Sequence, residues 1–161
     1  MTSRIFLLPE NRGRVLFGDG VLRHMYKYAQ TRFWHTEAGG QLFSDAPHAS
    51  SVVVSIASGP HLRDSRLRHN FVPDLTSATL DRQSQFSLGR HAIGLWHTHP
   101  EANPSPSNHD YETTRKYLEA FDGMMNGFLL VILGNSGNPL NIAVWLATTT
   151  PVDSWIKLKE V

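Results

Sequence analysis

Apolar positions recur at helical spacing in three segments of this chain. Residues 21, 22, 25, 26 and 29 are apolar, which predicts a helix over 21–30. The spacing over 75–88 is less regular, but Asp74 is a typical N-cap residue and Gly89 a typical helix stop, so a second helix is predicted there. A third helix is predicted over 107–121, and the residues on its apolar stripe are Tyr111, Leu118 and Phe121.

Short runs of β-branched, aromatic and other apolar residues predict strands between these helices. The predicted strands cover 15–17, 41–44, 51–57, 91–97, 127–133 and 140–148. Turn-rich residues at 45–47 and 134–139 separate neighbouring strands, and the polar segment 59–70 is predicted to be a loop. Strands and helices mixed in this order predict an α/β sandwich with a functional site at one end of its sheet.

The composition is that of an ordinary globular protein. The 161 residues suffice for one domain with a sizeable core, so a single domain over 1–161 is predicted. Hydrophobic residues make up 40% and charged residues 18%. With 15 basic against 14 acidic residues, the balance disfavours nucleic acid as the main partner.

Nothing in the sequence predicts a membrane segment or an export signal. No apolar run approaches the 18 or so residues of a transmembrane helix. The apolar run at 5–8 is too short for a secretory signal and is soon followed by Glu10. There is no cysteine, so disulfides and thiolate ligands are excluded. We expect a cytoplasmic protein, and nitrogen and oxygen ligands for any metal it binds.

The most informative motif begins with His97-Thr98-His99-Pro100, at the end of a predicted strand. Residues two apart on a strand point to the same side, so His97 and His99 can aim their imidazoles at one point. Asp110, at the start of the next predicted helix, adds a carboxylate. Two imidazoles and one carboxylate leave a fourth tetrahedral position for water, which is typical of a catalytic zinc ion.

Each of these residues also has a simpler interpretation. A histidine beside an apolar strand is commonly a packing residue, although the paired spacing favours ligands. Ser107 and Asp110 have the spacing of a helix capping box, and an acid at that position stays ionised, as a metal ligand must. Capping and metal binding by Asp110 are therefore compatible. His109 falls outside the motif and is predicted to lie at the surface or beside a metal ligand without binding the metal itself.

The spacing His-x-His, seven residues, Ser-x-x-Asp resembles the signature of the JAMM metalloproteases, the catalytic branch of the JAB/MPN domain family. The family has a glutamate upstream, followed by a small residue, a glycine and an apolar strand. Glu37, in Glu37-Ala38-Gly39, matches that position, and the resemblance runs roughly from residue 13 to residue 147. It implies a cytidine-deaminase-like mixed β-sheet flanked by helices, of the prokaryotic JAB type.

The resemblance also implies a chemistry. One catalytic Zn²⁺ would be held by His97, His99 and Asp110, with Glu37 as general base and proton shuttle. Ser107 would either stabilise the oxyanion or only cap the helix, and the sequence does not separate these roles. The implied reaction is hydrolysis of the isopeptide or peptide bond after the C-terminal glycine of ubiquitin or a ubiquitin-like protein.

The implied partners are conjugates of a ubiquitin-like protein and the E1- and E2-like enzymes of the same operon, in antiphage defence. Two alternatives stay open: a processing peptidase that matures a ubiquitin-like or sulfur-carrier precursor, and a RadC-like, DNA-repair-associated protein or non-catalytic binding module. Glu101-Ala102, after Pro100, differs from the Ser-Gly expected in the RadC branch.

Four further features also give predictions. Arg63, Arg66, Arg68 and His69 form a basic cluster that we interpret as part of a solvated loop. Trp96 is expected to pack in the core beneath the site. The two prolines between 101 and 106 predict a stiff rim, and segment 58–74 is either an ordered substrate-binding insertion or a mobile loop.

Overall fold

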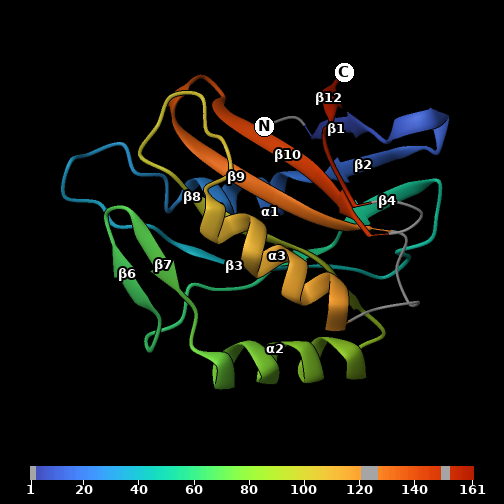
Figure 1. The fold of residues 1–161 in the computed structure, drawn as a ribbon, viewed down its shortest axis with the longest axis horizontal. Helices are drawn as coiled ribbons and strands as arrows, with labels where there is room; N and C mark the ends of the chain where they lie inside the picture. The colour runs from blue at the N-terminus through green and yellow to red at the C-terminus, as the bar shows by residue number, and fades with distance from the viewer. Residues whose placement is uncertain (1–2, 121–126, 150–152) are drawn as a thin grey trace.

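The computed structural model describes residues 3–120, 127–149 and 153–161. Its largest sheet has six strands in the order β11-β10-β9-β8-β3-β5, and a second has four in the order β12-β1-β2-β4. A separate hairpin, β6–β7, stands beside them, and the described ends of the chain lie close together where β12 pairs with β1 (Figure 1). The strands of the two sheets are β1 Arg4–Leu7, β2 Arg14–Phe17, β3 Gly39–Ser44, β4 Ser51–Val54, β5 Ile56–Ala57, β8 His91–Thr98, β9 Phe128–Gly137, β10 Leu140–Thr148, β11 Ser154–Lys157 and β12 Lys159–Glu160.

The hairpin consists of β6 Ser65–Leu67 and β7 Asn70–Val72. The helices are α1 Asp19–Tyr26, α2 Leu75–Ser87 and α3 Asn108–Ala120, with a short 3₁₀ turn at Pro9–Asn11. Figure 1 shows α2 and α3 side by side on one side of the six-stranded sheet, with α1 behind it. The mixed α/β architecture confirms the predicted fold class, whereas the single domain over residues 1–161 stays a prediction.

Strand β9 lies at the centre of the larger sheet and is apolar on both faces. Leu129, Val131 and Leu133 belong to the main core, which also holds Leu22 of α1. Phe128 faces the other way and joins a smaller cluster with Leu118 of α3. A strand buried on both faces has an unbroken apolar run rather than an alternating one, which explains the sequence of β9.

The segment 51–57 is not one strand, as predicted, but two strands in different sheets. β4 pairs with β2 of the smaller sheet, whereas β5 pairs with β3 of the larger one. The change occurs at Ser55, whose amide donates to the Phe43 carbonyl. The periodicity of the segment is continuous, so only the tertiary pairing reveals the break.

Other boundaries also differ from the prediction. α1 ends at Tyr26 rather than at residue 30, because the amides of Tyr28 and Ala29 donate only three residues back along the chain. β9 extends to Gly137, so the turn before β10 is shorter than predicted. Strands β1, β11 and β12 were not predicted. Phe121 of the predicted apolar stripe lies outside the described residues.

The predicted loop at 59–70 is wrong in its second half, where β6 begins. Ser65 pairs with Val72, and Leu67 with Asn70. Many side chains of this segment are polar, so a prediction based on the hydrophobic pattern does not detect the hairpin. In the described part of the chain, no helix is long and apolar enough to cross a membrane.

Candidate metal centre

The two histidines lie at the C-terminal end of strand β8, an inner strand of the sheet. β8 is parallel to β9 and antiparallel to β3, and His97 is paired with Gly39 and Ile132. After the strand ends, the amide of His99 still donates to the Leu133 carbonyl at 2.9 Å. A Cβ on Gly39 would lie 2.6 Å from the Trp96 carbonyl oxygen and 3.0 Å from the His97 Cβ. Glycine therefore permits the close approach of β3 that encloses His97.

Helix α3 presents Asp110 through a reciprocal capping box. The Ser107 amide donates to Asp110 Oδ2 at 2.7 Å, and the Asp110 amide donates to Ser107 Oγ at 3.2 Å. This is the capping arrangement predicted from the sequence, and it fixes the carboxylate at the positive end of the helix. Two hydrogen bonds also fix the rim segment between the histidines and the helix. The Asn135 amide donates to the Glu101 carbonyl, and the Asn141 side chain donates to the Ala102 carbonyl.

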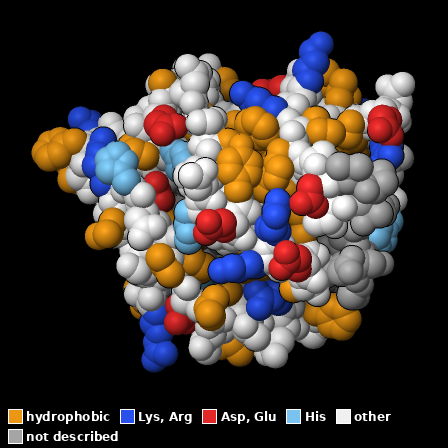
Figure 2. Space-filling view, in the orientation of Figure 1, with side chains coloured by type: hydrophobic (Ala, Val, Ile, Leu, Met, Phe, Trp, Pro, Cys, Tyr) orange, Lys and Arg blue, Asp and Glu red, His pale blue; other side chains and the backbone are white. Residues whose placement is uncertain are grey.

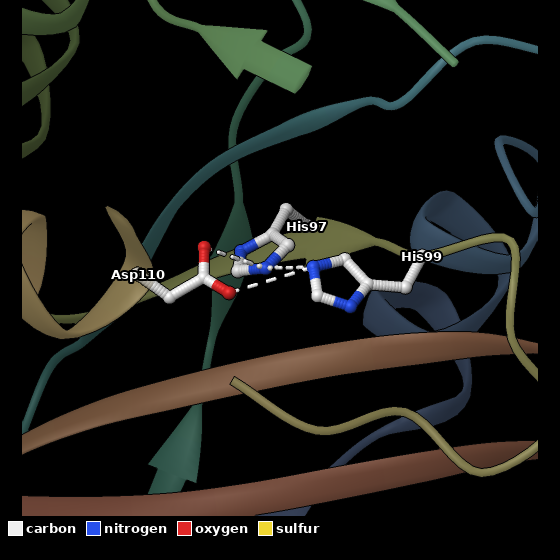
Figure 3. A group of neighbouring side chains, drawn as sticks. All are labelled: His97, His99 and Asp110. Atoms are coloured by element: carbon white, nitrogen blue, oxygen red, sulfur yellow. Dashed lines mark hydrogen bonds and ion pairs between the residues drawn. The ribbon is translucent and has the colours of Figure 1, made fainter. Parts of the chain in front are cut away.

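The three predicted ligands point at one another (Figure 3). His97 Nε2 lies 3.1 Å from His99 Nε2 and 3.2 Å from Asp110 Oδ1, and His99 Nε2 lies 3.4 Å from Asp110 Oδ2. Zinc binds nitrogen and oxygen at about 2.0–2.1 Å, so the edge of its coordination tetrahedron is about 3.3 Å. The three distances are close to this edge, but Asp110 offers Oδ1 to His97 and Oδ2 to His99. With one donor atom taken from each residue, all three lie within 4.8 Å of one another, so this donor set could hold a zinc ion.

The local electrostatics favour a charged Asp110. Burial opposes its ionisation, but hydrogen bonds from His97 and His99 outweigh that effect and hold the pKa of the carboxyl well below its ordinary value. For His99, burial opposes protonation, while the hydrogen bond to Asp110 and its charge raise the pKa above the ordinary value overall. Because a carboxyl group must be deprotonated to bind a metal, a carboxylate that stays ionised near neutral pH can serve as a ligand.

The other ring nitrogen of His99 is buried without a hydrogen bond. Among the described residues, no partner lies within bonding distance of His99 Nδ1, and Glu101 Oε2 lies 3.8 Å away. Histidines that bind a metal through Nε2 carry a proton on Nδ1 and usually donate it to a carboxylate or carbonyl. Glu101 lies within ion-pair distance of this nitrogen but does not accept a hydrogen bond from it.

Glu37 reaches the same cleft from the segment before β3. Its side chain is buried, with a relative exposure of 6% for the residue. Burial raises the pKa of the Glu37 carboxyl to about 7; the charge of His99 counters this, and those of Asp110 and Glu101 add to it. A carboxyl with a pKa near neutrality can both accept and return a proton, as a general base requires.

A cleft of about 300 Å³ joins these groups and continues between α2 and α3. On its α2 side, His61 Nε2 is 2.6 Å from Asp81 Oδ2. On its α3 side, the Thr114 hydroxyl is fully buried and has no partner among the described residues. Figure 2 shows histidines and acidic side chains close together on the left half of this face. The floor of the cleft is formed by Gln41, Leu95 and Leu130.

The remaining predictions for the site have mixed outcomes. Trp96 is buried as predicted, and its indole donates to the Ser58 carbonyl at 2.8 Å. His109 is exposed and lies outside the ligand triangle, as predicted. The solvated-loop interpretation of the basic cluster is wrong for Arg66 and Arg68, which both donate to main-chain carbonyls.

The sequence analysis missed the His61–Asp81 pair. Its members lie on a loop and on a helix 20 residues apart, and no motif connects them. Only the packing of α2 against the six-stranded sheet brings them together.

A mixed α/β fold with a His-x-His and Ser-x-x-Asp site in a cleft defines a JAB-type domain. The chain belongs to the family described as prokaryotic homologs of the JAB domain, which it matches over residues 19–148. It is 33% identical over 105 residues to a CD-NTase/cGAS isopeptidase of Pseudomonas aeruginosa (strain BWHPSA011 / Pa011). That match covers 63% of this chain and 65%, slightly less than two thirds, of the relative.

Solved structures with the same fold are also known. Protein DSY2949 of Desulfitobacterium hafniense superposes with a TM-score of 0.60 at 16% identity, covering 90% of this chain and 88% of that chain. A protein from Salinibacter ruber (strain DSM 13855) has a TM-score of 0.51 at 14% identity, covering 88% and 86%. At such low identity these likenesses concern the fold alone.

Proposed function

We propose that this chain is a zinc-dependent isopeptidase that removes a ubiquitin-like or similarly conjugated protein from its target. The observation that carries the proposal is the group of His97, His99 and Asp110, whose donor atoms lie close enough together to hold a metal ion, in one cleft with the buried carboxyl of Glu37. The family and the name of the Pseudomonas relative support the same class of reaction.

His97, His99 and Asp110 would hold the metal. Bound there, Zn²⁺ supplies a Lewis acid and lowers the pKa of a water molecule towards ~7. Glu37 accepts the proton of the attacking water and returns it to the departing amine, which a carboxyl with a pKa of about 7 can do in both directions.

Ser107 serves two purposes in this scheme. Its oxygen accepts the Asp110 amide as a helix cap, while its hydroxyl proton remains available to the cleft that the residue lines. Directed at the carbonyl oxygen of the scissile bond, this hydroxyl stabilises the developing negative charge. One such donor contributes about 3–4 kcal/mol in other hydrolases.

The substrate enters as an extended C-terminal tail. Asn70 and Phe71 of β7 form one side of the cleft, where an extended tail can lie along a strand. The Pseudomonas relative is named a CD-NTase/cGAS isopeptidase. For this chain we propose a related cytoplasmic role in antiphage defence, acting on conjugates made by E1- and E2-like enzymes.

The test begins with metal content, measured by elemental mass spectrometry on protein purified without added metal. We expect about one zinc ion per chain, lost in Asp110→Ala and retained in Glu112→Ala, a control on the exposed face of the same helix. A chain that takes up no metal even when zinc is supplied would refute the proposal.

Activity is then measured on two substrates made with the same modifier. A lysine-linked conjugate tests deconjugation, and a linear precursor with residues after its terminal glycine tests the processing alternative. We expect cleavage of the conjugate, abolished by Glu37→Gln and by Asp110→Ala.

A further inference from the structure

The position of Glu37 depends on the hydrogen bonds of its main chain rather than on those of its side chain. The segment between α1 and β3 has no helix or strand of its own around this residue. Among the described residues, no hydrogen bond reaches the Glu37 carboxylate, although the side chain is buried. Its location in the cleft therefore depends on whatever holds the backbone at residue 37.

Strand β6 holds that backbone from one side. The Glu37 amide donates to the Leu67 carbonyl at 2.8 Å, and Arg66 Nε donates to the Glu37 carbonyl at 2.7 Å. The Arg66 guanidinium also lies over the ring of Tyr28, 5.8 Å from its centroid. Both polar groups of the Glu37 main chain are thus satisfied by the hairpin, one by its backbone and one by a side chain.

The end of β8 holds the next residue from the opposite side. The Ala38 amide donates to Thr98 Oγ1 at 3.0 Å, and the Thr98 amide donates to the Ala38 carbonyl at 2.9 Å. Thr98 stands between the two histidine ligands in the sequence. The main chain at Glu37 and Ala38 is therefore hydrogen-bonded to the hairpin on one side and to the end of β8 on the other.

The buried side chain of Gln30 connects the two sides. Its amide oxygen accepts the Thr98 hydroxyl at 3.0 Å, and its amide nitrogen donates to the Arg68 carbonyl at 2.8 Å. Gln30 is only 1% exposed. The hairpin, the glutamate segment and the ligand strand thus form one hydrogen-bonded unit.

We propose that Arg66 is a positioning residue for the general base, acting through the carbonyl of Glu37. This inference rests on the proposed function for the role of Glu37, but the hydrogen bond that it invokes can be tested without activity. Displacement of a catalytic group by about 1 Å can reduce the rate about 100-fold, so a residue that never touches the substrate can control the chemical step.

The alternative is that Arg66 only stabilises the hairpin. Two three-residue strands are marginal on their own, and any arginine in the segment contributes charge. Arg63 provides the matched control: it is an exposed arginine in the same segment, so Arg63→Ala removes the same charge without touching the Glu37 main chain.

The first experiment measures amide hydrogen exchange in the metal-free protein. In Arg66→Ala, we expect the amides of residues 36–38 to exchange about fivefold faster than in the wild type, while β9 and β10 are unchanged. Arg63→Ala should exchange as the wild type does. Unchanged protection at Glu37 in Arg66→Ala would overturn the inference, whether or not the protein is an isopeptidase.

The second experiment measures kcat and KM on the lysine-linked conjugate, with zinc content checked for each variant. Arg66→Ala should lower kcat roughly 10- to 100-fold with KM and zinc content nearly constant, and Arg66→Lys, which keeps a donor, should recover part of the loss. A kcat within about twofold of wild type would overturn the inference while leaving the proposed function intact. Activity retained in Glu37→Gln would instead refute the role of the base.

Discussion

The buried carboxyl of Glu37 makes the stability of the metal-free protein depend on pH in an unusual direction. Its pKa is raised from 4.5 to about 7, mainly by burial. Between these values the folded state binds more protons than the unfolded state, so the free energy of unfolding falls as the pH rises. This contribution is fully present below about pH 4.5 and is lost by the time the pH passes about 7.

The size of the effect follows from the shift. One pKa unit corresponds to about 1.4 kcal/mol, so a rise from 4.5 to about 7 amounts to about 3 kcal/mol. Glu37→Gln keeps the shape of the protonated carboxyl but never ionises. The metal-free variant should therefore match the wild type near pH 4.5 and exceed its free energy of unfolding by about 3 kcal/mol above pH 7.5.

The assay is urea unfolding of chelator-treated protein at several pH values from 4.5 to 8. Subtracting wild type from Glu37→Gln removes the pH dependence that the two proteins share, and leaves that of the glutamate together with its charge interaction with His99. Glu112→Gln, on an exposed position of α3, serves as the control and should follow the wild type throughout. A Glu37→Gln curve parallel to the wild type from pH 4.5 to 8 would show that the carboxyl is not desolvated, and the argument for a base tuned to neutral pH would fail.

Three further substitutions test other parts of the site. Ser107→Ala should lower the free energy of unfolding by about 1 kcal/mol and Ser107→Gly by only a few tenths, because glycine is also a good N-cap residue. Both variants should nevertheless lower kcat about 100-fold, since both lack the hydroxyl. If kcat falls only in proportion to the loss of stability, Ser107 has the capping role alone. In Gly40→Ala the new methyl group would collide with the Ser58 carbonyl, so thermal unfolding should show a loss of about 3 kcal/mol, whereas Gly18→Ala, with open space around it, should lose far less. Thr114→Val removes a buried hydroxyl that has no partner in the part of the chain that the structure describes, and it should raise the free energy of unfolding by about 1 kcal/mol. A loss of similar size would mean that the hydroxyl is bonded.

Much of the fold could be predicted from local patterns. Helix α2 begins after Asp74 and β8 begins at His91, as the sequence indicates, because capping residues and apolar runs act over a few neighbours. The division of 51–57 between two sheets and the hairpin at 65–72 could not be predicted. Both depend on which strands pair, and pairing energies come from residues distant in the sequence.

The sequence by itself identified the candidate metal ligands. His97 lies near the end of β8 and His99 directly follows the strand, while Ser107 and Asp110 form a capping box, so local geometry orients the imidazoles and the carboxylate. Their convergence also depends on the hydrogen bonds that hold the rim between them. The family resemblance supplied Glu37, which has no local signal of its own.

Only the tertiary structure decided how Glu37 meets those ligands. The pairing of β3 with β8 brings residues 60 apart in the sequence into one cleft, and burial there gives the carboxyl its raised pKa. The hydrogen bond from Arg66 to the Glu37 carbonyl, which fixes the Glu37 main chain against the polar hairpin, is likewise absent from any sequence pattern. A main-chain carbonyl is the same in every residue, so the sequence carries no mark of the side chain that will bind it.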